Sequence, residues 1–192
     1  MDYTTAKEFV LKKLRDELKP ELYYHCYHHT IDVYESTKKL AKLENIVGKD
    51  LILLETAALF HDTGFLVKYE DHEEQSASVA RKYLPQFGYS SEDIEKICQM
   101  IVSTKLPQSP KNILDKILCD ADLDYMGRDD FFMIANKLLC EWNVNGIFTT
   151  LKKWYHIQVD FLSNNNYFTK SAKMMHKEKK KKNLSQILEL LS

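Results

Sequence analysis

The sequence contains little glycine and little proline, and neither sign of charge is in excess. Each of these features excludes some classes of fold or function. Among 192 residues only 5 are glycine and 4 are proline, which favours long helices over a sheet-rich fold with many tight turns. The 27 basic residues nearly balance the 28 acidic ones. There is therefore no global electrostatic reason to expect binding to nucleic acid or to an anionic membrane.

Paired cysteines and long apolar runs are also missing. The four cysteines, Cys26, Cys98, Cys119 and Cys140, are scattered and form no C-x-x-C pair, so we expect reduced thiols in the cytoplasm. The first residues show no basic-then-apolar signal segment. No apolar run reaches the roughly 18 residues that a membrane-spanning helix needs. We therefore expect a cytoplasmic protein that does not contact a membrane.

Several glycine-containing catalytic motifs are absent as well. The sequence has no G-x-S-x-G elbow, no G-x-x-x-x-G-K-[ST] phosphate loop and no G-x-G-x-x-G segment after a strand. Serine-hydrolase, P-loop and dinucleotide-binding chemistries therefore find little support.

Apolar spacing and capping residues predict a succession of helices. We expect them at about 4–18, 22–43, 50–61, 72–84, 91–104, 112–126, 130–142, 147–163 and 184–191. No segment alternates with a period of two, so the predicted fold class is all-α, a globular bundle without significant sheet. We expect a single domain over residues 1–192, with the motif-bearing core at about 20–145 and C-terminal helices at about 146–192 packing on it.

Some helix boundaries follow from particular residues. Asp71 and Glu74 resemble a capping box that opens the helix from 72. Ser90 and Asp129 are expected to cap the helices that follow them. The lysine-rich segment Lys177–Lys182 has no interleaved aromatics, so we expect a solvated linker or a frayed helix rather than a nucleic-acid contact.

The most informative feature is the pair His61-Asp62, which ends the nearly unbroken apolar run from Leu51 to Phe60. A helix that is apolar all round is buried. An imidazole and a carboxylate at its dry end cost free energy unless both are compensated, and a metal ion would compensate both. The alternative is a buried histidine bonded to a helix carbonyl, with Asp62 acting as a cap.

Two other segments contain candidate ligands. His29 shares a helix face with Val33, so it points inward; a lone inward histidine is more often a hydrogen-bonded core residue. Asp120, Asp122 and Asp124 lie within one helical turn and a half, and periodicity does not choose between Asp122 and Asp124 as the inward residue. A solvated acidic face is the alternative for all three aspartates.

The neighbouring cluster of Cys26, His28 and His29 lacks a second ligand pair at zinc-finger spacing. Two imidazoles and two carboxylates on separate helices instead suit Mn²⁺, Fe²⁺, Co²⁺, Ni²⁺, Zn²⁺ or Mg²⁺ without selecting among them. Such an ion lowers the pKa of a bound water and neutralises phosphate oxygens.

The order of these segments resembles the HD-domain superfamily of metal-dependent phosphohydrolases. His29-Thr30-Ile31-Asp32-Val33 is similar to its H-T-x-x-V signature, His61-Asp62-Thr63-Gly64 to its H-D-x-G motif, and Asp120-Ala121-Asp122-Leu123 to its D-A-D segment. The match covers roughly residues 20 to 145. The resemblance implies an HD-type helical fold and a metal bound by His29, His61, Asp62 and Asp122.

The resemblance also implies an activity. The ion would hold phosphate and supply hydroxide as the nucleophile, and the substrate would be a nucleotide or another small phosphorylated metabolite. Ile101 to Lys105 and Gly127-Arg128-Asp129 further resemble a subgroup of predicted phosphohydrolases of unassigned substrate. A second ion and a homodimer remain open.

Other side chains are candidates for the same site. Similar proteins often have a histidine near the position of His72, which would contact phosphate or a second metal; the alternative is a surface residue at the helix start. Glu73 is a candidate general base, and Asp62 could orient the attacking water with its free oxygen. Lys105, and with less support Lys68, could neutralise phosphate, or Lys105 could simply complement the helix dipole.

Two other functions are compatible with the same motifs. An HD-like domain could bind a nucleotide without hydrolysing it and signal to a partner. A di-iron HD-type oxygenase would need additional histidine ligands, for which His72 is the only good candidate between His61-Asp62 and Asp122.

Overall fold

The fold consists of helices only. The computed structural model describes residues 1–192 and contains nine α-helices, three short 3₁₀-helices and no strand. The α-helices are α1 (Tyr3–Glu17), α2 (Tyr27–Leu43), α3 (Gly48–Phe60), α4 (His72–Tyr83), α5 (Ser91–Ser103), α6 (Ile113–Asp122), α7 (Phe131–Val144), α8 (Leu151–Asn164) and α9 (Lys170–Leu191). The 3₁₀-helices are η1 (Thr63–Leu66), η2 (Leu84–Phe87) and η3 (Asp124–Gly127). This confirms the all-α prediction.

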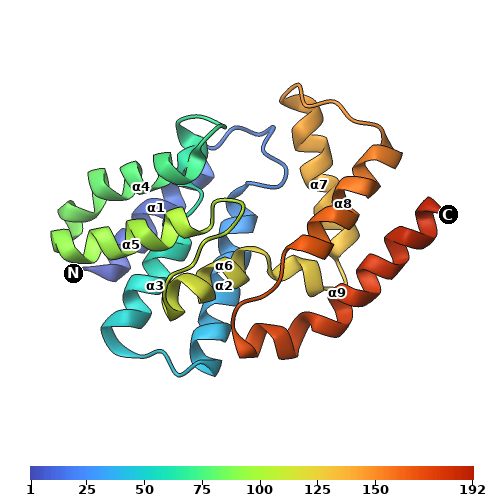
Figure 1. Cartoon of the computed structure of the whole chain (residues 1–192). Coiled ribbons are helices and arrows are strands. Elements are labelled where there is room, and N and C mark those ends of the chain that lie inside the picture. Colours follow the sequence, from blue (N-terminus) through green and yellow to red (C-terminus); the bar gives the residue numbers. More distant parts are fainter.

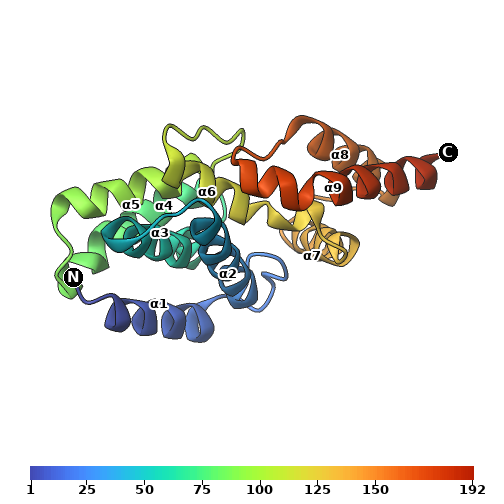
Figure 2. The same ribbon diagram turned by 90° about the horizontal axis from the view of Figure 1, so that it is seen from below.

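Helix α3 lies at the centre because nearly all its side chains are apolar. Its six buried apolar residues are Leu53, Leu54, Ala57, Ala58, Leu59 and Phe60, and it packs against α1, α2, α4, α5 and α6. The neighbouring helices are amphipathic and bury one stripe each. Figure 2 shows α1 running along one side of α2 and α3, with α4, α5 and α6 on the other side.

The packing of α2 positions the candidate site. Helix α2 contacts both α3 and α6, and Figure 1 shows α2 and α6 side by side in the middle of the molecule. The start of α2, the end of α3 and the end of α6 meet in this region. Each of the three predicted ligand segments therefore lies at a helix terminus, where side chains can spread toward a common point.

Helices α7, α8 and α9 form the other end of the molecule, drawn in orange to red in Figure 1. Helix α9 is continuous from Lys170 to Leu191, so the prediction of a linker or frayed segment at Lys177–Lys182 was wrong. One face of α9 is buried through four residues, Ala172, His176, Asn183 and Ile187. This packing keeps the lysine-rich part helical, since lysine side chains can extend to solvent from the other face.

Three local predictions need correction. Helix α2 begins at Tyr27 and not near residue 22, because residues 22–26 turn so that two backbone N–H groups donate to Glu141. Asp71 makes no capping hydrogen bond, and both Asp71 and Glu74 pair with Lys105 instead. Asp129 does not cap α7 and pairs with Lys179.

The prediction that Ser90 caps a helix is confirmed. The hydroxyl of Ser90 accepts the Asp93 N–H and caps α5. All four cysteines are free. None of the helices combines the length and the apolar composition that crossing a bilayer requires.

Candidate metal centre

Four polar side chains from three helix ends converge on one point. His29 lies in the first turn of α2, His61 and Asp62 directly follow α3, and Asp122 is the last residue of α6. The Nε2 atoms of His29 and His61 are 3.4 Å apart. His29, His61 and Asp122 offer ligand atoms that all lie within 4.8 Å of one another.

The carboxylates face these two nitrogens. Asp62 Oδ2 lies 3.3 Å from His29 Nε2 and 3.2 Å from His61 Nε2. Asp122 Oδ1 lies 3.3 Å and 3.6 Å from the same two nitrogens. The structure thus brings together the four side chains that the sequence motifs nominate.

The hydrogen bond of His61 orients its ring toward the cluster. Its Nδ1 donates to the carbonyl of Ala58 at 2.8 Å. Because a carbonyl oxygen only accepts, the proton lies on Nδ1, and Nε2 of the neutral ring presents a lone pair to the cluster. Histidine ligands of metals commonly donate their other ring nitrogen in this way.

The donor set fits a divalent cation. Asp62 Oδ2 is buried and has no hydrogen bond, which is costly for a carboxylate oxygen without a counter-charge. Two imidazole nitrogens and two carboxylate oxygens that point at one another are a mixed N/O set typical of divalent transition ions and Mg²⁺. A cation among them would satisfy all four groups at once.

Without a cation, the cluster holds protons instead. Burial alone would lower the pKa of both imidazoles, yet Asp62 and Asp122 outweigh burial, so the pKa of His29 is raised and that of His61 is raised well above its usual value. Burial would raise the pKa of Asp122, but His29 and His61 lower it to about 2. Metal and protons therefore compete for the same atoms.

Gly64 lets the start of α4 approach the cluster. A Cβ at Gly64 would come within 1.9 Å of the His72 carbonyl oxygen, so only glycine permits this packing. The Gly64 N–H also donates to Ser76 Oγ at 2.7 Å. The glycine of the H-D-x-G motif thus places His72 beside Asp62.

His72 lies between two carboxylates. Its Nε2 is 3.6 Å from Asp62 Oδ1 and 3.5 Å from Glu73 Oε1. Asp62 therefore directs one oxygen to the imidazole pair and the other toward His72. Glu73 is buried, and His72 and Glu73 both line the same cavity as Asp62.

Lys105 is not brought to the cluster. Its ammonium lies 2.7 Å from Glu74 and 3.0 Å from Asp71, and it lines neither cavity that borders the four ligands. Lys68 lies 3.6 Å from Asp71 at the same surface. These lysines are near the start of α4 but are engaged by its carboxylates.

The structure distinguishes the three aspartates of the D-A-D region. Asp120 accepts the N–H groups of Phe168 and Thr169 at 2.7 and 2.8 Å. Asp124 lies 2.6 Å from His176 Nε2. Only Asp122 faces His29 and His61. The choice between Asp122 and Asp124, which periodicity left open, is thus made by the packing of α9 against η3.

Glu141 of α7 is a site-shaping residue that the sequence analysis missed. Glu141 is fully buried. Its carboxylate accepts hydrogen bonds from the backbone N–H groups of Tyr24 and His25. It also contacts Nδ1 of the His25 ring at 2.5 Å and accepts a hydrogen bond from the Tyr69 hydroxyl at 3.0 Å. Although burial opposes it, His25 lowers the pKa of Glu141. No local pattern reveals this role, since Glu141 lies 116 residues from His25.

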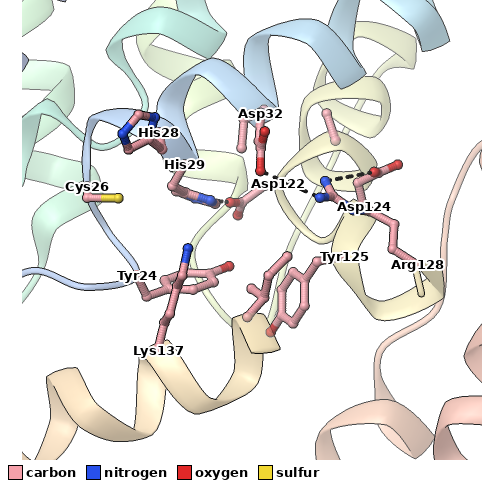
Figure 3. A pocket seen from close by; sticks show the side chains of 13 residues that line it. Tyr24, Cys26, His28, His29, Asp32, Asp122, Asp124, Tyr125, Arg128 and Lys137 are labelled. Carbon is pink, nitrogen blue, oxygen red and sulfur yellow. Dashed lines mark ion pairs between the residues drawn. The ribbon is translucent and has the colours of Figure 1, made fainter. Parts of the chain in front are cut away.

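Two cavities border the cluster and share Tyr24, Asp122 and Tyr125. The larger has a volume of about 230 Å³ and includes Asp62. It is rich in aromatic side chains, namely Tyr24, Phe65, Tyr69, Tyr125, Trp142 and Phe161. The smaller, of about 40 Å³, includes His29 and is shown in Figure 3. Cavities thus border the cluster on two sides.

Comparisons with known proteins identify a family. Residues 26–126, more than half of the chain, match the HD domain family, and this stretch contains all four clustered side chains. No curated protein matches the chain.

Solved structures share the fold over nearly the whole chain. A predicted HD superfamily hydrolase from an uncultured Thermotogales bacterium is 22% identical, with a TM-score of 0.62 over 98% of this chain and 90% of that one. Bacillus subtilis YpgQ, solved in complex with ADP, is 22% identical, with a TM-score of 0.69 over 99% and 95%. The Lin1889 protein from Listeria innocua is 21% identical, with a TM-score of 0.67 over 100% and 97%.

Proposed function

Because the chain belongs to the HD-domain family, we propose that it is a phosphohydrolase that cleaves a phosphoester or phosphoanhydride of a nucleotide or another small phosphorylated metabolite. Family membership supports a metal-dependent hydrolase in general. The observation that supports the proposal most is the meeting of His29, His61, Asp62 and Asp122 around a buried carboxylate oxygen that lacks a hydrogen bond.

These four residues would hold the metal ion. A divalent ion there supplies Lewis acidity, which lowers the pKa of a water and neutralises the phosphate oxygens. The protein supplies orientation: the hydrogen bond from His61 to Ala58 fixes one ring, and the helix ends fix the other ligands. Two cavities at the cluster leave room for water and for substrate.

Asp62 and His72 are positioned to orient the attacking water and to take up its proton. Asp62 Oδ1 points away from the imidazole pair and lies 3.6 Å from His72 Nε2. A water beside this oxygen would be oriented by it and could give up its proton to it. Glu73, 3.5 Å from His72, would stabilise positive charge on the His72 ring.

The larger cavity favours a substrate that contains a flat ring. Its aromatic side chains offer faces on which a nucleobase could stack, and base–aromatic stacking tolerates different bases. YpgQ, which has the same fold, was solved with ADP. Both observations favour a nucleotide over a small aliphatic phosphate.

The variant Asp62→Ala tests the proposal. We expect it to lose bound metal and phosphatase activity while its circular dichroism stays helical, because the remaining ligands are two imidazoles and one carboxylate. Asp16→Ala is the matched control, since Asp16 is an exposed residue of α1. If Asp62→Ala hydrolyses phosphates as fast as the parent, the assignment is wrong.

A substrate panel would define the substrate class. The protein loaded with Mn²⁺ should be given nucleoside mono-, di- and triphosphates, dinucleoside polyphosphates, cyclic nucleotides and an aryl phosphate. Activity restricted to one group names the substrate class. Nucleotide binding without turnover under any divalent ion would contradict hydrolysis and favour a nucleotide-sensing domain.

A further inference from the structure

The smaller cavity has a basic side chain that no predicted role uses. Lys137 of α7 lines it together with His29 and Asp122. In Figure 3 the Lys137 side chain extends from α7 past the Tyr24 ring, and its nitrogen points toward His29 and Asp122. The chain therefore directs an ammonium group toward the candidate metal centre from the side opposite α2.

Lys137 is an exposed residue and forms no ion pair with the carboxylates that line this cavity, Asp32, Asp122 and Asp124. The other basic residue there, Arg128, contacts Asp130 at 2.5 Å, Asp32 at 3.6 Å and Asp124 at 3.7 Å. In Figure 3 the marked ion pairs of Arg128 lead to Asp32 and Asp124, and no marked ion pair reaches Lys137. Arg128 is thus engaged by three carboxylates, whereas the Lys137 ammonium is not engaged by any.

The larger cavity provides no comparable charge. Its lining includes His25 and His72 but neither lysine nor arginine. Lys105, the cation that the sequence suggested, is engaged by Asp71 and Glu74. If the substrate carries a second phosphate, the additional positive charge that could bind it lies in the smaller cavity, on Lys137.

We propose that Lys137 binds a second phosphate group of the substrate, adjacent to the phosphate held at the metal centre. This proposal rests on the proposed function for the position of the first phosphate. A lysine suits the task because its ammonium is a compact charge with three rotatable donors on a flexible stem. The aromatic cavity would hold the ring of the same molecule, so the preferred ligands are nucleoside di- and triphosphates rather than monophosphates.

The test compares Lys137→Met, Lys137→Arg and the control Lys152→Met, an exposed lysine of α8, each as the full chain with Mn²⁺. Dissociation constants are measured for pyrophosphate, ADP and AMP, or KM for any that is turned over. We expect Lys137→Met to weaken pyrophosphate and ADP about 10-fold, the effect of one charge-assisted hydrogen bond. AMP binding should change less than about 2-fold, and Lys137→Arg should retain most of the affinity.

Metal affinity is measured separately on the same variants. Removal of the Lys137 charge should leave Mn²⁺ binding equal or tighter, because it removes a positive charge near the ion. Equal binding of ADP and pyrophosphate by parent and Lys137→Met would overturn the second-phosphate site. An equal loss for AMP would do the same, since it would show a general electrostatic effect.

The two proposals fail in different ways. If the parent with Mn²⁺ binds neither pyrophosphate nor any nucleoside diphosphate, the second-phosphate site is wrong. If these ligands bind in a manner that depends on Lys137 but no phosphate is ever hydrolysed, the proposed hydrolysis is wrong and the site stands. If turnover persists while Lys137→Met matches the parent for every ligand, only the second-phosphate site is lost.

Discussion

Two carboxylates of α6, two residues apart, have opposite surroundings. Asp120 faces the C-terminal part of the chain and accepts the Phe168 N–H, the Thr169 N–H and the Thr169 hydroxyl, all within 2.8 Å. Asp122 faces the end of α3 and the start of α2, where its neighbours are two imidazoles that can themselves bind a metal.

The difference separates a structural carboxylate from a candidate ligand. Asp120 has neutral hydrogen-bond donors that hold the start of α9 in place, so its buried charge is solvated by the protein. Asp122 belongs to a group in which each member is compensated only if a proton or a cation lies between them. A buried acid surrounded by donors indicates anchoring, whereas one surrounded by other ligand atoms indicates a binding site.

The largest expected effect comes from Asp122→Asn. An amide carries no negative charge, so the cation loses one of two carboxylates while the fold keeps a residue of the same shape. We expect Mn²⁺ affinity to fall at least about 100-fold, the upper range for damage to the surroundings of a metal ligand. Isothermal titration with Mn²⁺ measures it. Unchanged affinity would break the distinction between the two aspartates.

The converse variant, Asp120→Asn, should reduce stability rather than metal binding. The amide can accept some of these hydrogen bonds but places an N–H₂ group opposite other donors. We expect the free energy of unfolding to fall by about 2 kcal/mol, measured by urea denaturation, with Mn²⁺ affinity within about 3-fold of the parent. A metal affinity reduced as much as in Asp122→Asn would contradict an anchoring role.

Removal of the metal should have a smaller effect, which is to make the thermal stability depend on pH. This dependence should involve Asp122, at the end of α6, and not Asp120. In chelated protein, the pKa values of His29 and His61 are raised by Asp62 and Asp122. This contribution to stability is fully present below the unfolded-state pKa of about 6.5 and is lost as pH rises through the folded-state pKa. We therefore expect the Tm of chelated protein to decline from pH 6 to pH 9 by about 5 °C.

Mn²⁺ should reverse this trend, because it binds the neutral imidazoles and so stabilises more as pH rises. Asp122→Asn should flatten the decline in the chelated protein, whereas Asp120→Asn should keep it. Differential scanning fluorimetry with EDTA or Mn²⁺ across this pH range gives both comparisons. A Tm that rises with pH in EDTA would show that the imidazoles are not held protonated by their aspartates.

The smallest effect is expected for Lys105→Ala. Its ammonium pairs with Asp71 and Glu74 at an exposed surface, where such pairs add little to stability. We expect kcat for the substrate found in the panel to change less than about 2-fold, roughly 0.4 kcal/mol. Steady-state kinetics would show a much larger loss of kcat if Lys105 neutralises phosphate, as the sequence suggested.

Local sequence patterns were enough to predict the helical fold and to nominate candidate metal ligands. The unbroken apolar run before His61 and Asp62 dictates a central buried helix, and few glycines and prolines leave long helices intact. These are local properties: side-chain periodicity and burial follow from residues close together in the chain. The motif order then nominated His29, His61, Asp62 and Asp122, and the structure brings these four together.

Tertiary structure alone decided which charges face the centre. The packing of α4 beside Lys105 provides Asp71 and Glu74 as its partners. Lys137 of α7 has no such partner and extends toward Asp122 (Figure 3). Glu141 shapes the turn before α2 from more than a hundred residues away. Such contacts depend on how helices pack against one another, and no local pattern of residues records that arrangement.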